Sequence, residues 1–190
     1  MQIVRGYAMA EYFAAFLRGV NVNGNKISME ALREAFSEMG FAGARTELNT
    51  GNVVFRSEQS LAETKPRIEN GLNTVFGYDA PVFLRSVPEL EALRGTAKTL
   101  SVPEDCHLYL LLCGSAALLA ELEALFISLP HGESESFLPA AGDAFWIVPK
   151  GETLSSPFGA KALGAKRFRD QLTSRNWNTV EKVLDRMRVN

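Results

Sequence analysis

Residues 12–17, YFAAFL, are followed directly by residues 18–28, RGVNVNGNKIS. The first stretch is apolar at every position, which is typical of a strand whose two faces are both covered. The second stretch is rich in Asn and Gly, contains one Arg and one Lys, and ends at Ser28, a suitable N-cap for a helix. This junction therefore predicts a buried strand, a polar loop and a helix start in direct succession.

The residues that follow predict two further strands joined by a tight turn. A helix with apolar residues at helical spacing stops at Gly40, because glycine accepts the left-handed backbone that ends a helix. Two strands, residues 44–49 and 52–57, then flank Thr50-Gly51, which is a two-residue hairpin connection.

A second helix and a fourth strand complete the first half of the chain. The helix contains Pro66, which a helix tolerates only near its first turn, and it stops at Gly77. Residues 81–85 predict the fourth strand. The resulting strand–helix–strand–strand–helix–strand order is the ferredoxin-like split βαβ pattern.

The second half of the chain repeats part of this order. Residues 108–112 form another apolar strand, Ser115 can cap the next helix, and a Gly-containing turn follows. We therefore predict an α+β fold of two tandem ferredoxin-like (split βαβ) subdomains with C-terminal helices. The expected domains are residues 9–86 for the N-terminal subdomain and residues 87–190 for the C-terminal subdomain with the terminal helices.

The last predicted helix covers residues 173–187, TSRNWNTVEKVLDRM. Thr173 or Ser174 is expected to cap it, which places Arg175 and Asn176 in its first turn. A cation in the first turn opposes the helix dipole and Asn is a poor helix former, so these residues indicate a polar role. That role is either an ion pair with another segment or a part in holding an anion.

The split βαβ pattern brings two polar segments to one edge of a sheet. In this pattern the third strand lies between the first and the second and runs antiparallel to both. The end of the first strand at Arg18 is therefore expected beside the hairpin at Thr50-Gly51, together with the helix start at Ser28. Helix starts and Arg or Lys side chains attract anions, and Asn amides can orient a polar ligand.

We predict a ligand-binding site from these residues. Its expected members are Arg18, Asn21, Asn23, Lys26, Ser28, Asn49, Thr50, Asn52, Arg175 and Asn176. Turn chemistry alone accounts for each Asn or Gly taken singly, because tight turns need both residue types. Arg18 and Lys26 favour binding, since a turn does not require them.

The chain shows no motif for a metal, a cofactor or a catalytic centre. The stretch from Gly19 to Ser28 resembles a P-loop, but one extra residue lies between Gly24 and Lys26, so the fixed registry around a phosphate is lost. Two cysteines and two histidines occur without zinc-ligand spacing. No activated nucleophile or general base is recognisable, so the sequence leaves enzymatic activity open.

Charge and hydropathy limit the partners of the chain. The net charge of −2 and the pI near 5.8 do not favour general affinity for nucleic acid. Residues 161–190 nevertheless contain eight Lys or Arg against three acids. No apolar stretch is long enough for a membrane span, and the N-terminus has no secretory signal, so we expect a cytoplasmic protein without a membrane partner.

Three stretches resemble the uncharacterised bacterial family called domain of unknown function 1697. They are LRGVNVNGNKISMEALREAFSEMGF, RTELNTGNVVF and TSRNWNTVEK, within a resemblance that covers residues 12–187. The resemblance implies a pair of α+β subdomains of ferredoxin-like character and brings no established activity. The chain departs from the family pattern at Asn23, where Gly is usual, and at Glu47, where an aromatic residue is common.

Three functional hypotheses follow. The leading one is binding of a small phosphate- or carboxylate-bearing ligand at the sheet edge formed by the RGVN and NTGN segments. The second is single-stranded nucleic-acid binding, which needs aromatic side chains exposed on a sheet face. The third is a protein-interaction module, monomeric or homodimeric, in which the Asn-rich segments serve only as turns and interface.

Overall fold

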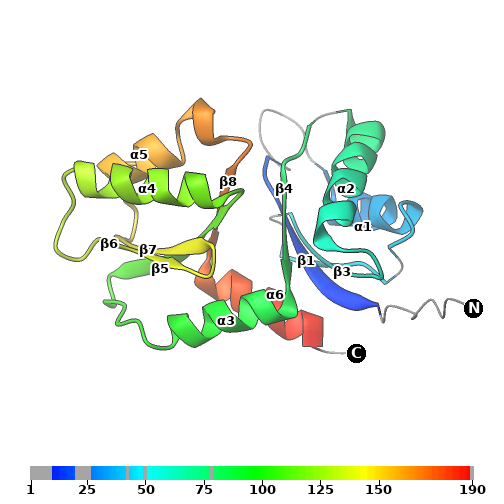
Figure 1. The fold of residues 1–190 in the computed structure, drawn as a ribbon, viewed down its shortest axis with the longest axis horizontal. Helices are drawn as coiled ribbons and strands as arrows, with labels where there is room; N and C mark the ends of the chain where they lie inside the picture. Colours follow the sequence, from blue (N-terminus) through cyan, green and yellow to red (C-terminus); the bar gives the residue numbers. More distant parts are fainter. Residues whose placement is uncertain (1–9, 20–26, 42, 49–50, 78, 189–190) are drawn as a thin grey trace, which may run out of the picture. The chain divides into compact units, whose positions relative to one another are not determined.

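The computed structural model of the chain describes residues 10–19, 27–41, 43–48, 51–77 and 79–188. The chain divides into two compact units. The N-terminal unit comprises Met1–Val87 and Arg186–Asn190, and the C-terminal unit comprises Pro88–Asp185. Each unit contains a four-stranded antiparallel sheet with helices, so the α+β class is confirmed (Figure 1).

The sheet of the N-terminal unit has the strand order β2-β3-β1-β4. Its members are β1 (Glu11–Leu17), β2 (Arg45–Glu47), β3 (Asn52–Ser57) and β4 (Val82–Ser86). Strand β3 pairs antiparallel with both β1 and β2, as the sequence predicted. This order determines which loops share an edge of the sheet.

Both faces of β1 are buried, which confirms the interpretation of its uninterrupted apolar run. Phe13 and Leu17 belong to the core of the N-terminal unit, and Ala14 and Phe16, on the opposite face, have no exposed surface. Helices α1 (Met29–Glu38) and α2 (Leu61–Phe76) contribute to the core on the Phe13 face.

Helix α1 begins and ends as the sequence predicted. The Ser28 hydroxyl oxygen accepts a hydrogen bond from the Ala31 amide at 3.0 Å. At the other end Gly40 has a φ of 83°, and the Phe41 amide donates to the Phe36 carbonyl at 2.9 Å. The Gly40 amide also donates to the Ser37 carbonyl at 2.9 Å, and together with the Phe41 bond it forms a Schellman motif, which directs the chain back toward the sheet.

Helix α2 starts with a capping box. The Ser60 amide and hydroxyl both donate to one Glu63 carboxylate oxygen, at 3.0 and 2.7 Å, and Ser60 accepts from the Glu63 amide. With Ser60 as the cap, Pro66 is the sixth residue of α2 and lies in its second turn, just beyond the first turn where a helix best tolerates proline. The capping box offsets part of the cost of the backbone hydrogen bond that Pro66 cannot donate.

The capping box makes the stability of α2 depend on pH. The Ser60 hydroxyl, and then its amide, hold the pKa of the Glu63 carboxyl below the ordinary value of 4.5. The contribution is therefore complete above pH 4.5 and disappears as the pH falls through the lower folded-state pKa. We expect Glu63→Ala to destabilise the protein at pH 7 and to have less effect at pH 3, measured by urea unfolding. An equal effect at both pH values would contradict this account.

The C-terminal unit repeats the strand pattern, with the order β6-β7-β5-β8. Its strands are β5 (Cys106–Cys113), β6 (Ser136–Ala140), β7 (Asp143–Pro149) and β8 (Leu172–Asn176). The turn between β6 and β7 contains Ala141 and Gly142, both with positive φ. Both cysteines are buried and neither forms a disulfide.

Helices cover both faces of this sheet (Figure 1). Helices α4 (Ala116–Ser128) and α5 (Pro157–Ala162) pack on one face around Trp146. On the other face, Trp177 of α6 (Trp177–Arg188) contacts Phe145, with ring centroids 5.2 Å apart. Helix α3 (Val87–Ala97) lies on the α6 side, where Arg94 forms an ion pair with Asp185 at 3.7 Å.

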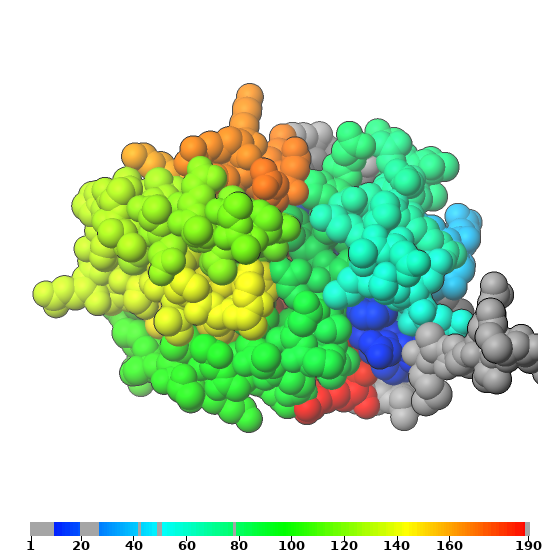
Figure 2. Space-filling view, in the orientation of Figure 1, coloured from blue at the N-terminus to red at the C-terminus, as the bar shows by residue number. Residues whose placement is uncertain are grey.

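On the face drawn in Figure 2, the surface of the C-terminal unit includes α4 and the β6–β7 hairpin, together with the α3 segment in green and the α5 segment in orange. A short 3₁₀ helix (Lys166–Phe168) follows α5 and leads to β8.

In the part of the chain that the structure describes, no helix combines the length and the apolar character that a membrane crossing requires.

Candidate functional site

Two polar segments meet where β1 ends. The Leu17 amide donates to the Gly51 carbonyl at 2.8 Å, and the Arg18 amide donates to the Pro81 carbonyl at 3.1 Å. Phe16 is paired with Asn52 at the start of β3. The backbone geometry predicted from the split βαβ pattern is therefore confirmed at the described residues, and we call this place the Arg18 edge.

Gly51 has a φ of 71°, which glycine adopts without strain and which the hairpin turn needs. Ser28 caps α1 through the bond to Ala31, so its hydroxyl already has a structural role. Five predicted site residues lie outside the described residues, namely Asn21, Asn23, Lys26, Asn49 and Thr50.

Asn52 lies inside the hairpin. Asn52 is fully buried, and its side-chain nitrogen Nδ2 donates to the Glu47 backbone carbonyl at 3.0 Å. This bond joins the two strands next to the turn and thereby positions the backbone at Gly51.

Glu47 has a partner in the last turns of α6. Arg186, which is grouped with the N-terminal unit, places its Nε and one terminal nitrogen 3.1 Å from a Glu47 carboxylate oxygen. The departure from the family pattern at Glu47 is thus accompanied by an ion pair.

Arg175 and Asn176 lie in strand β8 of the C-terminal unit, so their predicted place in the first turn of a helix is wrong. Arg175 pairs with Leu110 in β5, and its guanidinium donates to the Thr173 hydroxyl at 2.9 Å. Helix α6 starts at Trp177. Pairing with β5 extends the strand through Thr173 and Ser174, the two residues predicted to cap the helix.

The cap of α6 is Asn176. Its side-chain oxygen accepts from the Asn178 amide at 3.0 Å, which is the bond that an N-cap residue makes to the second residue of a helix. A structural role therefore accounts for Asn176.

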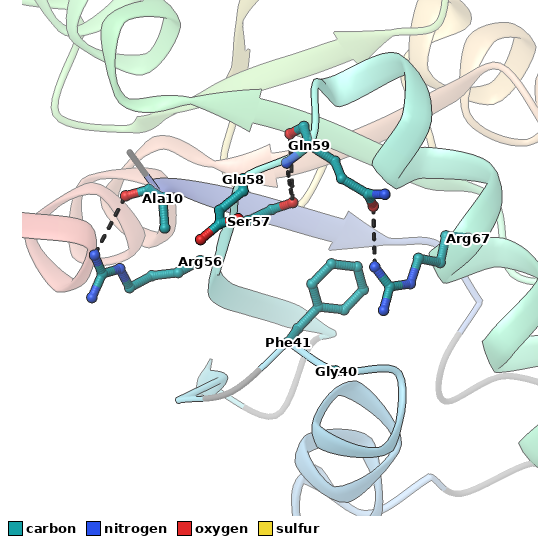
Figure 3. Close-up of a pocket in the computed structure, with 8 residues that line it drawn as sticks. All are labelled: Ala10, Gly40, Phe41, Arg56, Ser57, Glu58, Gln59 and Arg67. Atoms are coloured by element: carbon teal, nitrogen blue, oxygen red, sulfur yellow. Dashed lines mark hydrogen bonds between the residues drawn. The ribbon is translucent and has the colours of Figure 1, made fainter. Parts of the chain in front are cut away.

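A pocket of about 620 Å³ lies at the end of the N-terminal sheet that is opposite the Arg18 edge (Figure 3). Its lining residues lie just before β1, just after α1, at the end of β3 and in the loop that follows it, and in α2; they are Ala10, Gly40, Phe41, Arg56, Ser57, Glu58, Gln59 and Arg67. Sequence reasoning did not single out its two arginines. The only signal was the proximity in sequence of Arg56 to the end of β3 and of Arg67 to the capped start of α2.

The described residues show no reactive group of obvious catalytic character. Burial raises the pKa of the Cys106 thiol, with a smaller contribution from the nearby Asp105 carboxylate, so the thiolate is disfavoured. No group of three or more His, Cys, Asp or Glu residues that could hold a metal ion occurs in that part of the chain.

The aromatic residues of the N-terminal strands are mostly buried. Phe13, Phe16, Phe55 and Phe83 have at most 5% of their surface exposed. Base stacking needs an accessible ring, so these four side chains do not provide a platform for single-stranded nucleic acid.

The family described as "Protein of unknown function (DUF1697)" matches residues 9–138. The chain belongs to this family. The resemblance seen in the sequence is therefore confirmed. No curated protein sequence matches this DUF1697 protein.

Among solved structures, this DUF1697 protein is similar to the conserved bacterial protein SP0830 from Streptococcus pneumoniae. The TM-score is 0.75 at 20% sequence identity, over 95% of this chain and 100% of that chain. At this identity the similarity shows a shared fold.

Proposed function

We propose that this protein binds a small anionic ligand, bearing a phosphate or a carboxylate, at the Arg18 edge. The observation that supports the proposal is the backbone bond from Leu17 to Gly51, because it joins two polar segments about thirty residues apart in the sequence. Arg18 and Lys26 supply positive charge, and Asn21 and Asn49 orient the ligand.

The remaining predicted residues have supporting roles in this proposal. Ser28 presents the start of α1, whose first amides and macrodipole favour an anion. Asn23 and Thr50 belong to the two polar segments of the sequence, and Asn52 holds the hairpin through Glu47. Arg175 and Asn176 lie in the C-terminal unit, so they have no direct contact with the ligand in this proposal.

Removal of the Arg18 guanidinium tests the proposal. A thermal-shift screen with nucleotides and phosphorylated metabolites identifies ligands, and their affinities are then measured by calorimetry. We expect Arg18→Ala to weaken binding about tenfold or more, since a charge-assisted contact to an oxyanion is lost. Arg33→Ala, which removes an exposed arginine of α1, is the matched control and should bind as the original protein does.

Unchanged affinity of every ligand in Arg18→Ala would refute the assignment. An equal loss in Arg33→Ala would refute it as well, because it would show an effect of net charge alone.

The interaction hypothesis is the alternative proposal. In that case Asn49 and Asn176 serve folding and association, and the chain works through a protein partner or as a homodimer. Light scattering that gives a dimer mass, together with an Asn49→Ala variant that loses stability but keeps its ligand affinity, would favour this alternative. Asn176→Ala is expected to lose stability in either case, because it removes the cap of α6.

We also infer that the two units are tandem ferredoxin-like subdomains. The strand orders β2-β3-β1-β4 and β6-β7-β5-β8 follow the same pattern in both units, and this supports the inference. We propose domains at residues 9–86 and 87–190, with Arg186–Asn190 at the end of the second segment grouped with the N-terminal unit. We also propose a cytoplasmic location, which cell fractionation can test.

A further inference from the structure

The pocket at the opposite end of the N-terminal sheet is separate from the Arg18 edge. It adjoins Ala10, just before β1, whereas Arg18 directly follows β1. A strand of seven residues spans about 20 Å, so the two places lie at opposite ends of the sheet. We call the second place the Arg56–Arg67 pocket. Its volume of about 620 Å³ lies within the usual range of small-molecule sites.

Arg67 is held in position by three neighbours. Its guanidinium donates to the Gln59 side-chain oxygen at 3.1 Å and to the Met39 carbonyl, and its central carbon lies 4.7 Å from the centre of the Phe41 ring. In Figure 3 this guanidinium and the Phe41 ring lie next to each other at the pocket. The two bonds use only part of the five N–H groups of an arginine, so donors remain for a ligand.

Gly40, which has no side chain, allows the Arg67 guanidinium to lie against the end of α1. A Cβ atom at Gly40 would lie 2.9 Å from a terminal nitrogen of Arg67, and the φ of 83° also disfavours any side chain there. The end of α1 thus leaves room for the guanidinium beside it.

Arg56 supplies a second cation to the same pocket. Its guanidinium donates to the Ala10 carbonyl at 3.4 Å and lies 5.3 Å from the centre of the Tyr12 ring. Within the described residues neither Arg56 nor Arg67 forms an ion pair with a carboxylate. Glu58 is the single acid among the lining residues, so the charged side chains of the pocket have a net positive sum.

The position of Arg67 has a structural explanation too. An arginine near the end of a helix stabilises the last carbonyl groups, and Arg67 does this for α1 at Met39. That role does not require the second arginine, and it does not account for a pocket between them. A guanidinium without an acidic partner pairs readily with an oxyanion, because its planar fork matches two oxygen atoms.

We propose that the Arg56–Arg67 pocket binds a small molecule that carries a phosphate or carboxylate group. Arg67 forms the principal contact with the oxyanion, and Arg56 adds positive charge from the other side of the pocket. Glu58 accepts a hydrogen bond from a hydroxyl or amino group elsewhere in the same molecule.

Calorimetric titration of the full chain tests this proposal with three probes at constant ionic strength. The probes are sodium phosphate, sodium acetate and ribose 5-phosphate, so that phosphate and carboxylate recognition are distinguished and a ligand of larger size is included. Each pocket variant is made in two parent proteins, the original protein and Arg18→Ala. The second parent lacks the principal charge of the Arg18 edge, so binding that it retains does not depend on that edge.

We expect at least one probe to bind in both parents, and Arg56→Ala and Arg67→Ala each to weaken that binding about tenfold or more. Arg33→Ala is the control for net charge and should have no effect. Arg67→Ala can fail to fold, because it removes the contact with Met39 at the end of α1. In that case the affinity of Arg56→Ala tests the proposal, since the Arg56 side chain is exposed and its removal should leave the fold intact.

Absence of binding by all three probes would overturn the proposal. Unchanged affinity in Arg56→Ala and in a folded Arg67→Ala would overturn it too, and so would an equal loss in Arg33→Ala. Binding that disappears in Arg18→Ala alone would overturn it in favour of the Arg18 edge.

Discussion

Replacement of Trp146 by alanine is expected to lower the free energy of unfolding by about 3–5 kcal/mol. Trp146 has no exposed surface and lies in the core of the C-terminal unit, with its ring centre 5.4 Å from that of Phe158 and 5.8 Å from that of Tyr109. Truncation removes this buried area and leaves a cavity beneath α5. Urea unfolding followed by circular dichroism measures the change.

Two further variants separate the causes of this loss. Trp146→Phe keeps an aromatic ring but removes the N–H group that donates to the buried Glu135 carboxylate at 3.0 Å, so we expect a cost of about 1–3 kcal/mol. Ile127→Ala, at a side chain that is 72% exposed on α4, should change stability by less than about 0.5 kcal/mol. Similar losses in Trp146→Ala and Ile127→Ala would contradict the account of this core.

Phe55→Ala should have an effect of similar size on the N-terminal unit, again about 3–5 kcal/mol. Phe55 is fully buried, and its ring centre lies 4.9 Å from that of Phe41 and 5.4 Å from that of Phe36. Loss of this ring leaves α1 and the Schellman residue Phe41 without their common contact in the sheet.

Amide hydrogen exchange is the suitable measurement for Phe55→Ala, because both tryptophans lie in the C-terminal unit and their fluorescence reports on that unit. We expect faster exchange in β1 and β3. Val75→Ala, at an exposed position of α2, is the control. Unchanged exchange in both strands would show that Phe55 is not central to this core.

Local signals in the sequence predicted much of the N-terminal unit. The apolar run before Arg18 predicted a strand covered on both faces, and Gly40 followed by Phe41 predicted the end of α1. These features depend on residues close together in the chain, where periodicity and capping chemistry act directly. The strand order then followed from the order of the elements.

The start of the last helix could not be predicted in the same way. Thr173 and Ser174 are common at helix caps, but Thr is also favoured in strands. Pairing with β5, about sixty residues earlier in the sequence, determines that residues 172–176 are extended. Asn176 then provides the cap that the local pattern had assigned to Thr173 or Ser174.

The Arg56–Arg67 pocket also depends on long-range geometry. Gly40 and Phe41 end one helix, Arg56 lies near the end of β3, and Arg67 projects from α2. Each residue alone is ordinary for its element. Only the packing of the three elements places both guanidinium groups beside one pocket.

We propose that the segments at Arg18 and Gly51 form a single anion site, and a phosphate titration followed by nuclear magnetic resonance can test this. We expect the backbone amide signals of Arg18 and Gly51 to shift together and to fit one dissociation constant, and we expect Arg18→Ala to raise the constant fitted at Gly51 about tenfold or more. Signals at the two residues that stay fixed, or that follow different constants, would contradict it.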